Sequence, residues 1–459
     1  MTHDPSSVSS AVTIGFALLL AAMIASLAFE EKLHAKKSVI VAGFAALCLL
    51  LGGLLDLLPF SEMVIVVGEE HIDLPIYIPA IDWEVVAIIL GSSLFVDITS
   101  KSGLFTWIAI ALTKTSKGDP LRLLMFYGVM TVAFSAVLNN VTAMIIVGSL
   151  TAVSLTRLQL GDKLLGFLLI EGLLTNVGGL LTLISSVPNI IVGDAAGITF
   201  MTFFTRAAPY VVVVTGITIW MGAKVFGIHP LASDEARSVA AQRVSGFDEN
   251  DGIKSRFKFN FGAVMLGAFI VTIAAASIPD TVLHSLGMGY VALSFAVIML
   301  VQYKSIADRF YQAVDWDLLA FFGALFVVIN VMEHAQVLAL IGRGVTPILG
   351  LGDTIGPATM LVSAAVTSSV TDNIPLAAML ATILGNLDLS ADSPYWWAVI
   401  FGANLGGNIT PIGSASTLVA VTIIHKHGLA LSFASFVRAA LPFAVVQLGL
   451  AAVYVLWVL

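Results

Sequence analysis

Long apolar stretches recur along the whole chain, and they constrain its fold more than any other feature of the sequence. Residues 11–29, 38–58 and 261–278 reach or approach the roughly 20 apolar residues that cross a hydrocarbon core as a helix. Hydrophobic residues make up 58% of the chain and charged residues 11%, whereas a soluble domain carries about 25% charged residues. The sequence therefore predicts an all-α polytopic membrane protein.

Ten stretches have the length and composition of membrane spans, and two further apolar stretches are interrupted. The ten spans are residues 11–29, 38–58, 83–112, 163–195, 204–227, 260–279, 287–303, 316–341, 394–424 and 434–458. The stretches 121–158 and 354–385 contain polar residues near the middle, and we expect each to form a hairpin that enters and leaves the membrane on one side. The longest polar stretch, 229–260, is too short for an ordinary soluble domain.

The distribution of basic residues predicts the orientation. With the N-terminus outside, all but three of the 21 Lys and Arg residues fall in cytoplasmic segments, and Lys37 is one of those cytoplasmic residues. The exceptions are Lys101, Arg206 and Arg343. This bias predicts a multi-pass protein of the plasma (inner) membrane with both termini outside. Residues 1–10 contain no Lys or Arg, so we expect the first span to be a true span rather than a secretory signal.

Comparison of the chain with itself reveals an internal repeat. A shift of 233 residues superposes residues 82–84 on 315–317 and superposes the two hairpins, with Ser135 opposite Ser368. A shift of 228 aligns the Asn-x-Gly-Gly motif of residues 176–179 with that of residues 404–407. Each half carries five spans, an odd number, so the second half is expected to be inverted relative to the first.

The repeat predicts the organisation of the chain. Residues 1–228 form the first repeat, with hairpin 121–158 and broken helix 163–195. Residues 229–259 form a cytoplasmic linker, and residues 260–459 form the second repeat, with hairpin 354–385 and broken helix 394–424. Inverted repeats with broken helices are typical of transporters whose site lies near the middle of the bilayer. We expect the polar tips 138–142 and 371–375 and the breaks 175–188 and 403–416 to converge there.

These paired motifs also resemble a known family. The stretches concerned are FSAVLNNVTAMIIVG, LTNVGGLLTLISSVPNIIVG, VDWDLLAFFGALFVVINVMEHAQVL, SSVTDNIPLAAML and FGANLGGNITPIGSASTLVAV. They resemble the ArsB/NhaD branch of the ion-transporter superfamily, in particular NhaD-type sodium/proton antiporters and the melanosomal P protein. The resemblance covers most of the chain from residue 83 to residue 441. It implies a homodimer with a fixed scaffold region and a moving transport region.

The resemblance also implies where the substrate or ion is bound. The implied positions at the tips are Asn139, Asn140, Thr142, Asp372 and Asn373, and those at the breaks are Asn176, Thr182, Asn404, Thr410 and Ser414. A sodium ion would be held by Asn139, Asn140, Asp372 and Asn373. Many relatives have Asp-Asn at the first tip and Gly-Asp-Pro-Pro-Asn at the first break. This chain lacks both of those acidic residues, which puts sodium selectivity and stoichiometry in doubt.

Two carboxylates are candidates for proton coupling. Asp372 at a hairpin tip would be partly desolvated, so that a proton and a hard cation would compete for its oxygens. Its alternative role is to cap the second helix of the hairpin through backbone N–H groups. Glu171 lies within a span, where an ionisable group costs about 2.5 to 3.5 kcal/mol to insert. It is either a proton relay or a carboxylate that reaches the interface.

The chemistry-bearing motifs leave several functions open and exclude others. The sequence contains no HExxH, GxSxG or GxxxxGK[ST] motif, and Cys48 is the single cysteine, so we expect no enzyme and no cofactor. We expect the partners to be membrane lipid, a small ion and a second copy of the chain, without nucleic acid. The leading function is sodium (or similar cation)/proton antiport by alternating access. The alternatives are efflux of an arsenite- or silicate-type oxyacid, sodium-coupled carboxylate or anion transport, and a channel. The expected absence of basic residues near the tips argues against a multiply charged anion.

Overall fold

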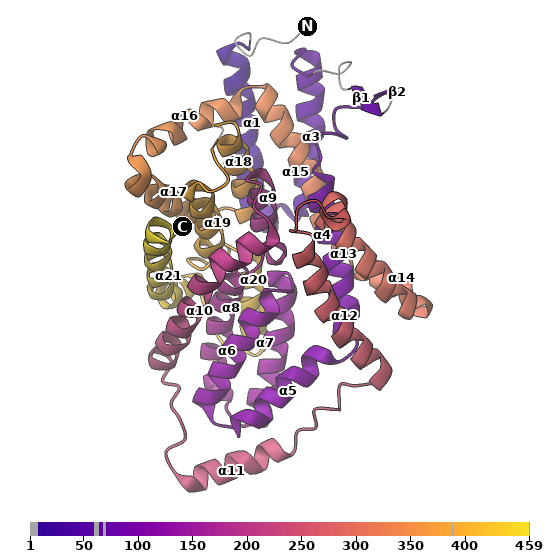
Figure 1. Cartoon of the computed structure of the whole chain (residues 1–459). Helices are drawn as coiled ribbons and strands as arrows, with labels where there is room; N and C mark the ends of the chain where they lie inside the picture. The colour runs from indigo at the N-terminus through magenta and orange to yellow at the C-terminus, as the bar shows by residue number, and fades with distance from the viewer. Residues whose placement is uncertain (1–7, 59–63, 68–69, 388, 459) are drawn as a thin grey trace.

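The computed structural model describes residues 8–58, 64–67, 70–387 and 389–458 (Figure 1). These residues form helices apart from one short antiparallel ladder. Within the described ranges, nine helices are long and apolar enough to cross a membrane. Eight of them correspond to predicted spans, and the ninth is one arm of the first hairpin. The two remaining predicted spans are the broken helices, whose halves are each too short to be counted.

The first half begins with three long helices, α1 (Ser10–Ala28), α3 (Lys37–Leu54) and α4 (Trp83–Ser100). The single turn α2 (Glu30–Leu33) links the first two, and His34 ends this turn in the left-handed conformation with φ of 51°. Asp82 begins α4 by accepting a hydrogen bond from the backbone N–H of Val85 at 3.0 Å.

Two of the predicted spans each consist of two helices that are separated by a bend. Residues 83–112 divide into α4 and α5 (Leu104–Ser116) at Gly103, which has φ of 87°. Residues 316–341 divide in the same way into α15 (Trp316–His334) and α16 (Val337–Leu349) at Gln336, with φ of 59°. Gly103 and Gln336 are related by the 233-residue shift. A residue in the left-handed conformation therefore ends the span in both repeats, although it is glycine in the first and glutamine in the second.

Each half contains a helical hairpin. Hairpin 1 consists of α6 (Pro120–Ser135) and α7 (Asn140–Arg157), and hairpin 2 consists of α17 (Gly352–Ser368) and α18 (Asn373–Gly385). Figure 1 shows hairpin 1 in the lower half of the view and hairpin 2 in the upper half. The two predicted hairpins are confirmed as re-entrant elements of oppositely oriented halves.

The broken helices follow the hairpins. The first consists of α8 (Leu164–Gly178) and α9 (Val187–Ala195), and we call the segment between them, residues 179–186, break 1. The second consists of α19 (Pro394–Gly406) and α20 (Ala415–Lys426), and residues 407–414 form break 2. A long helix closes each half, namely α10 (Phe200–Val225) in the first and α21 (Phe433–Trp457) in the second.

The second half opens with α12 (Arg256–Ala275) and α13 (Val282–Gln302), and the short helix α14 (Ala307–Ala313) leads to α15. The two halves pack against each other through two helix pairs: α3 of the first half contacts α15 of the second, and α4 of the first half contacts α13 of the second. The second pairing is tight, since a Cβ atom on Gly91 would lie 2.4 Å from the backbone of Ala292. We call α1, α3, α4, α12, α13 and α15 the scaffold.

Two elements were not expected from the sequence. Strands β1 (Val64–Val67) and β2 (Glu70–Asp73) pair antiparallel within the loop between α3 and α4. The run of β-branched residues at 64–67 favours such a strand, but its surroundings gave no alternating pattern. Helix α11 (Asp234–Ser245) lies in the predicted linker and is capped by Ser233, whose hydroxyl accepts from the backbone N–H of Ala236.

Candidate functional site

Matching hydrogen bonds join each hairpin to the broken helix of its own half. Ser135 donates to the carbonyl of Thr175 at 2.6 Å, and Ser368 donates to the carbonyl of Ala403 at 2.6 Å. The serines are related by the 233-residue shift and the carbonyls by the 228-residue shift. The contacts of the two halves therefore obey the same internal symmetry as the sequence.

The threonines of the two breaks repeat this arrangement. Thr182 in break 1 donates to the carbonyl of Ala136 at the end of hairpin 1's first helix, and Thr410 in break 2 donates to the carbonyl of Ser369 in hairpin 2. These carbonyls belong to the last turn of a helix, where no intrahelical donor remains. Thr182 and Thr410 thus satisfy the backbone of the tips, and both are buried.

Glycines allow the close approach on which these bonds depend. A Cβ atom on Gly178 would lie 2.8 Å from the backbone of Val132, and one on Gly406 would lie 2.4 Å from the carbonyl oxygen of Ala365. Val132 and Ala365 are again related by the 233-residue shift. The Asn-x-Gly-Gly motifs therefore bring each broken helix into backbone contact with its hairpin.

The carbonyls released at break 1 are satisfied within the protein. The Asn189 side chain donates to the carbonyls of Gly179 at 2.6 Å and Thr182 at 3.0 Å, and the Ser185 hydroxyl donates to the same two oxygens. Unsatisfied backbone groups cost several kcal/mol inside a bilayer. This bonding explains how the chain can be irregular at a buried position.

A buried amide network connects the two halves through Asn176. Its side-chain nitrogen donates to Asn408 at 2.8 Å and to Ser414 at 2.9 Å, and its oxygen accepts from Ser416 at 2.9 Å. All four residues are buried, and three of them belong to the second half. Asn408 in turn donates to Gln447 on α21 at 2.8 Å.

Asn404 makes the corresponding connection in the opposite direction. It accepts from Ser186 at 2.7 Å and donates to Asn189 at 2.8 Å. Ser186 and Ser414 are related by the 228-residue shift, as are Asn404 and Asn176. Asn176 and Asn404 therefore hold the two breaks against each other at the centre of the molecule. Sequence reasoning missed Ser186, Asn189, Asn408, Ser416 and Gln447.

Removing one of these amides should destabilise the protein. Asn404→Ala leaves the buried oxygen of Asn189 and the hydroxyl of Ser186 without a partner, and such losses cost about 1 to 3 kcal/mol. We expect a lower apparent melting temperature of the purified protein in detergent. Asn386→Ala, at an exposed position, is the matched control and should leave the melting temperature nearly unchanged. An equal effect of both substitutions would contradict the role assigned to Asn404.

The tip of hairpin 1 is held by its own amides. Asn139 caps α7 by accepting from the backbone N–H of Thr142 at 2.8 Å. Asn140 accepts from Ser135 at 2.7 Å, and its amide lies against Gly179, where a Cβ atom would approach it to 2.6 Å. Asn139, Asn140 and Thr142 thus have local structural partners.

The tip of hairpin 2 differs because it carries a carboxylate with a cationic partner. One oxygen of Asp372 accepts from the backbone N–H of Ile374 at 3.1 Å and caps α18. The other lies 2.6 Å from the ammonium of Lys37, the first residue of α3. Asn373 is the first residue of α18, directly after this cap.

This ion pair borders a cavity of about 360 Å³ between hairpin 2, break 2 and the turn that joins α1 to α3. Its lining includes Thr371, Asp372 and Ser414, together with Glu30 on α2 and Lys37 at the start of the scaffold helix α3. Asp372 and Ser414 are the two predicted site residues that meet in this cavity. Within the described ranges, no hydrogen bond joins the two hairpin tips, so the four residues expected to hold sodium are not gathered at one point in this conformation.

The position of Lys37 corrects the expectation that no basic residue lies near the tips. The left-handed turn at His34 instead directs the start of α3 to the tip of hairpin 2, where Lys37 is also 4.0 Å from Glu30. Its neighbour Ser38 donates to Asp317 on α15. The ammonium of Lys37 is thus close to the carboxylates of Glu30, Asp317 and Asp372.

Glu171 lies in the interior, as the hypothesis of a proton relay requires. Its side chain is fully buried in α8 and accepts from Thr151 on α7 at 2.6 Å. Its second oxygen has no hydrogen-bond partner among the described residues. The Glu171 side chain is therefore enclosed by protein and is not exposed at the surface of the molecule.

Comparison with known proteins decides the family. A family model described as CitMHS, citrate transporter, matches residues 20–402. The chain belongs to this family. An uncharacterized transporter of Mycobacterium tuberculosis is 31% identical to this chain over 384 residues, covering 82% of this chain and 86% of that protein. The human P protein is 25% identical over 98% of this chain and 60% of its own length, which confirms the expected branch of the ion-transporter superfamily.

Two solved transporters share the fold of this CitMHS member. YdaH of Alcanivorax borkumensis, described as having an unusual topology, aligns with a TM-score of 0.58 and 14% identity over 92% of this chain and 98% of YdaH. MtrF of Neisseria gonorrhoeae, from a class of antimetabolite efflux pumps, aligns with a TM-score of 0.56 and 15% identity over 92% of this chain and 95% of MtrF. The family model and the mycobacterial relative show that the chain is a membrane transporter and not an enzyme.

Proposed function

We propose that this transporter exchanges a monovalent cation such as sodium for protons, with Asp372 as the group that binds them in turn. The observation that supports this most is the ion pair between Asp372 and Lys37 at the edge of the cavity. A carboxylate that already holds an ammonium ion can hold another cation of the same charge. Carboxylate, hydroxyl and carbonyl oxygens are also the ligands that hard cations require.

Lys37 acts in this proposal as an internal substitute for the transported cation. It belongs to the scaffold, whereas Asp372 belongs to hairpin 2. When a cation or a proton binds Asp372, the attraction between α3 and hairpin 2 weakens. The hairpin can then move relative to the scaffold, and the empty carboxylate is again neutralised by Lys37 when it returns. Alternating access follows from this competition for a single negative charge.

Glu171 carries a second proton in the same mechanism. A charge on its side chain would lie in the interior without a cationic partner, and a buried unpaired charge costs several kcal/mol. Polar groups continue from it along hairpin 1. Thr151 and Ser154 lie on one face of α7, Ser154 accepts from Tyr127 at 2.8 Å, and Tyr127 lies 2.7 Å from Thr113 on α5.

Transport of a carboxylate is the second candidate, and two observations favour it. The family model is named for citrate, and Lys37 offers a positive charge at the cavity. The charges around it argue for a cation, however, because Glu30, Asp372 and Asp317 surround this single ammonium. A tricarboxylate would have to enter a site with an excess of negative charge.

Transport assays in liposomes distinguish the two candidates. The protein is reconstituted with a pH-sensitive dye inside the vesicles, which are then challenged with sodium, lithium, arsenite, silicate or citrate. The expected result is a pH change that depends on sodium or lithium and needs no organic anion. A pH change that occurs with citrate alone would replace cation exchange by carboxylate transport.

Neutralising Lys37 should strengthen cation binding. In Lys37→Gln the external cation no longer competes with the ammonium, so we expect the KM for sodium to fall about tenfold, equivalent to ~1.4 kcal/mol. Lys36→Gln, at the exposed neighbouring position, is the control and should leave the KM for sodium unchanged. If Lys37→Gln instead abolished a citrate response, the lysine would be an anion-binding residue.

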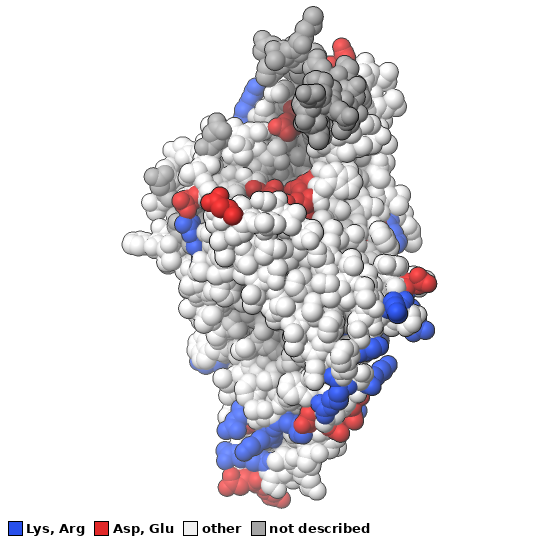
Figure 2. Space-filling view, turned by 45° about the vertical axis from the view of Figure 1, so that its right-hand side comes forward, with Lys and Arg blue, Asp and Glu red and all other residues white. Residues whose placement is uncertain are grey.

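The proposal includes the orientation of the transporter in the membrane and its oligomeric state. Lys and Arg gather at the lower end of the molecule, the end that carries α11, and we assign this end to the cytoplasm (Figures 1 and 2). This orientation corresponds to the plasma membrane with both termini outside. The family resemblance supports a homodimer, which native mass spectrometry of the detergent-purified protein can test.

A further inference from the structure

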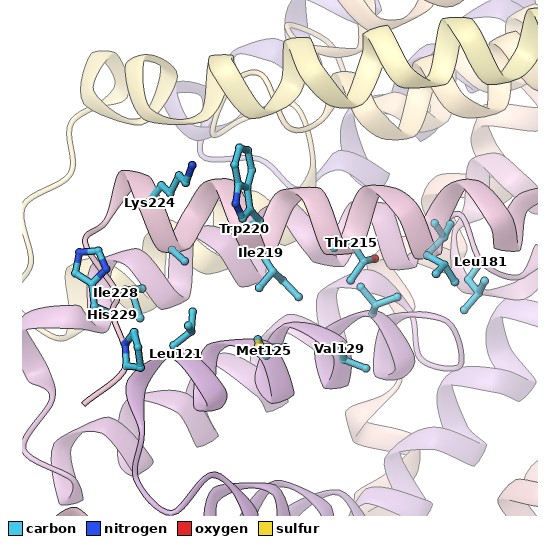
Figure 3. A pocket seen from close by; sticks show the side chains of 16 residues that line it. Leu121, Met125, Val129, Leu181, Thr215, Ile219, Trp220, Lys224, Ile228 and His229 are labelled. Carbon is cyan, nitrogen blue, oxygen red and sulfur yellow. The ribbon is translucent and has the colours of Figure 1, made fainter. Parts of the chain in front are cut away.

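An open groove of about 660 Å³ lies between hairpin 1 and α10, separate from the cavity at Asp372 (Figure 3). Along its length it is formed by apolar side chains such as Met125 and Val129 on α6 and Val212 and Ile219 on α10. Met125, Val129 and Val212 are each at least half exposed. In a membrane protein such a surface faces hydrocarbon chains.

One end of the groove carries positive charge. Lys224 in the last turn of α10 and His229 just after this helix both belong to the lining. The ammonium of Lys224 lies 4.0 Å from the centre of the ring of Trp220, which also lines the groove. No Asp or Glu is among the lining residues in the described part of the chain. The groove is therefore apolar along its length and cationic at one end.

The backbone fixes this charged end. Asp119 uses one carboxylate oxygen to cap α6 at Arg122 and the other to accept from the backbone N–H of Leu231 at 2.9 Å. The segment after α10 is thereby tied to the start of hairpin 1. The negative charge of Asp119 is buried and engaged with these two N–H groups. The end of the groove is preformed rather than dependent on a ligand.

We propose that this groove binds one anionic phospholipid, with its headgroup phosphate at Lys224 and His229 and an acyl chain along α10. From Lys224 to Val211 the helix rises about 20 Å, which is comparable to one leaflet, half of a ~30 Å hydrocarbon core. The charged end lies where the chain leaves α10 and continues to α11, on the side that we assign to the cytoplasm, where an anionic headgroup of that leaflet would reside (Figure 1). The lipid would bridge hairpin 1 and α10.

Thr215 provides a check on the kind of occupant. Its hydroxyl is buried, lines the middle of the groove and has no partner among the described residues. A hydrocarbon chain at this point makes no use of the hydroxyl, so Thr215→Val should leave lipid binding unchanged. A ligand with a polar group at this depth would bind less well to Thr215→Val, which would overturn the assignment to a phospholipid.

Lipid retention measured by native mass spectrometry tests the proposal directly. The purified full-length protein is incubated with phosphatidylglycerol or phosphatidylcholine of the same acyl chains, and glycerol phosphate serves as the headgroup without a chain. We expect phosphatidylglycerol to be retained at least several-fold more than phosphatidylcholine, and glycerol phosphate not at all. Lys224→Gln combined with His229→Gln should reduce phosphatidylglycerol to the level of phosphatidylcholine.

A groove-filling variant tests the contribution of the acyl chain to binding separately from that of the headgroup. Gly216 lines the groove and has open space around a Cβ atom, so Gly216→Phe should occupy the groove without disturbing the fold and should lower retention of both lipids. Gly43→Phe, at an open position on α3, is the control and should retain phosphatidylglycerol like the wild type. Equal retention of the two lipids by the wild type, or unchanged retention by Gly216→Phe, would overturn the proposal. So would loss of a dimer in Gly216→Phe, because the groove would then belong to a protein interface.

Discussion

Asp372→Asn is expected to reduce cation-dependent proton movement in proteoliposomes to the level of protein-free vesicles. Asparagine has nearly the same shape and can still accept from the backbone N–H of Ile374, so the start of α18 is preserved. It has no negative charge, however, and can neither pair with Lys37 nor bind a cation and a proton in turn. The substitution therefore removes the exchange chemistry while keeping the hairpin.

Asp392→Asn is the matched control, because Asp392 is an exposed carboxylate that pairs with Arg206 at 2.7 Å. Exposed ion pairs contribute about 0 to 1 kcal/mol, so its transport should equal that of the wild type. The melting temperature of each variant shows that it is folded. Persistent cation-dependent proton movement in well-folded Asp372→Asn would remove Asp372 from the mechanism.

Gly406→Ala is expected to cause the largest loss of stability among single-methyl additions in the broken helices. Its Cβ atom would lie 2.4 Å from the carbonyl oxygen of Ala365 and 2.8 Å from the Cβ atom of Ser368. Both neighbours belong to a packed helix of hairpin 2 and cannot rotate away. Overpacking of this kind costs about 2 to 3 kcal/mol. The apparent melting temperature and the yield of monodisperse protein in detergent measure the effect.

Gly449→Ala on α21 is the comparison, since nothing lies within 4 Å of a Cβ atom at that position. Alanine is a better helix former than glycine by about 1 kcal/mol, so this variant should be as stable as the wild type or more stable. Equal stabilities of Gly406→Ala and Gly449→Ala would contradict the close contact between α19 and hairpin 2 described above.

The repeated architecture could be predicted from the sequence because both copies keep the residues that their backbone requires. Ser135 and Ser368 bond equivalent carbonyls, and Gly178 and Gly406 make equivalent close approaches. Such residues are determined by local geometry and recur at a constant shift. The ends of the spans were harder to predict. Gln336 adopts the left-handed conformation that Gly103 adopts in the first repeat, and a glutamine does not signal such a bend in the sequence.

The partners of the site residues could be predicted only in part. The 228-residue shift relates Ser186 to Ser414, so Ser186 could have been found from the sequence. Gln447 offered another signal, since a lone amide in an apolar span requires a buried partner, here Asn408. The contact between Lys37 and Asp372 could not be predicted, because it depends on how α3 packs against α15 and on the turn at His34.

Binding of radioactive sodium to the detergent-purified protein across a range of pH tests the competition for Asp372 most directly. If one proton and one cation compete for the same carboxylate, the apparent affinity for sodium falls about tenfold for each pH unit below the pKa of that group. We predict this decline in the wild type, tighter binding in Lys37→Gln and no specific binding in Asp372→Asn. Sodium binding that is independent of pH, or that survives in Asp372→Asn, would contradict the account.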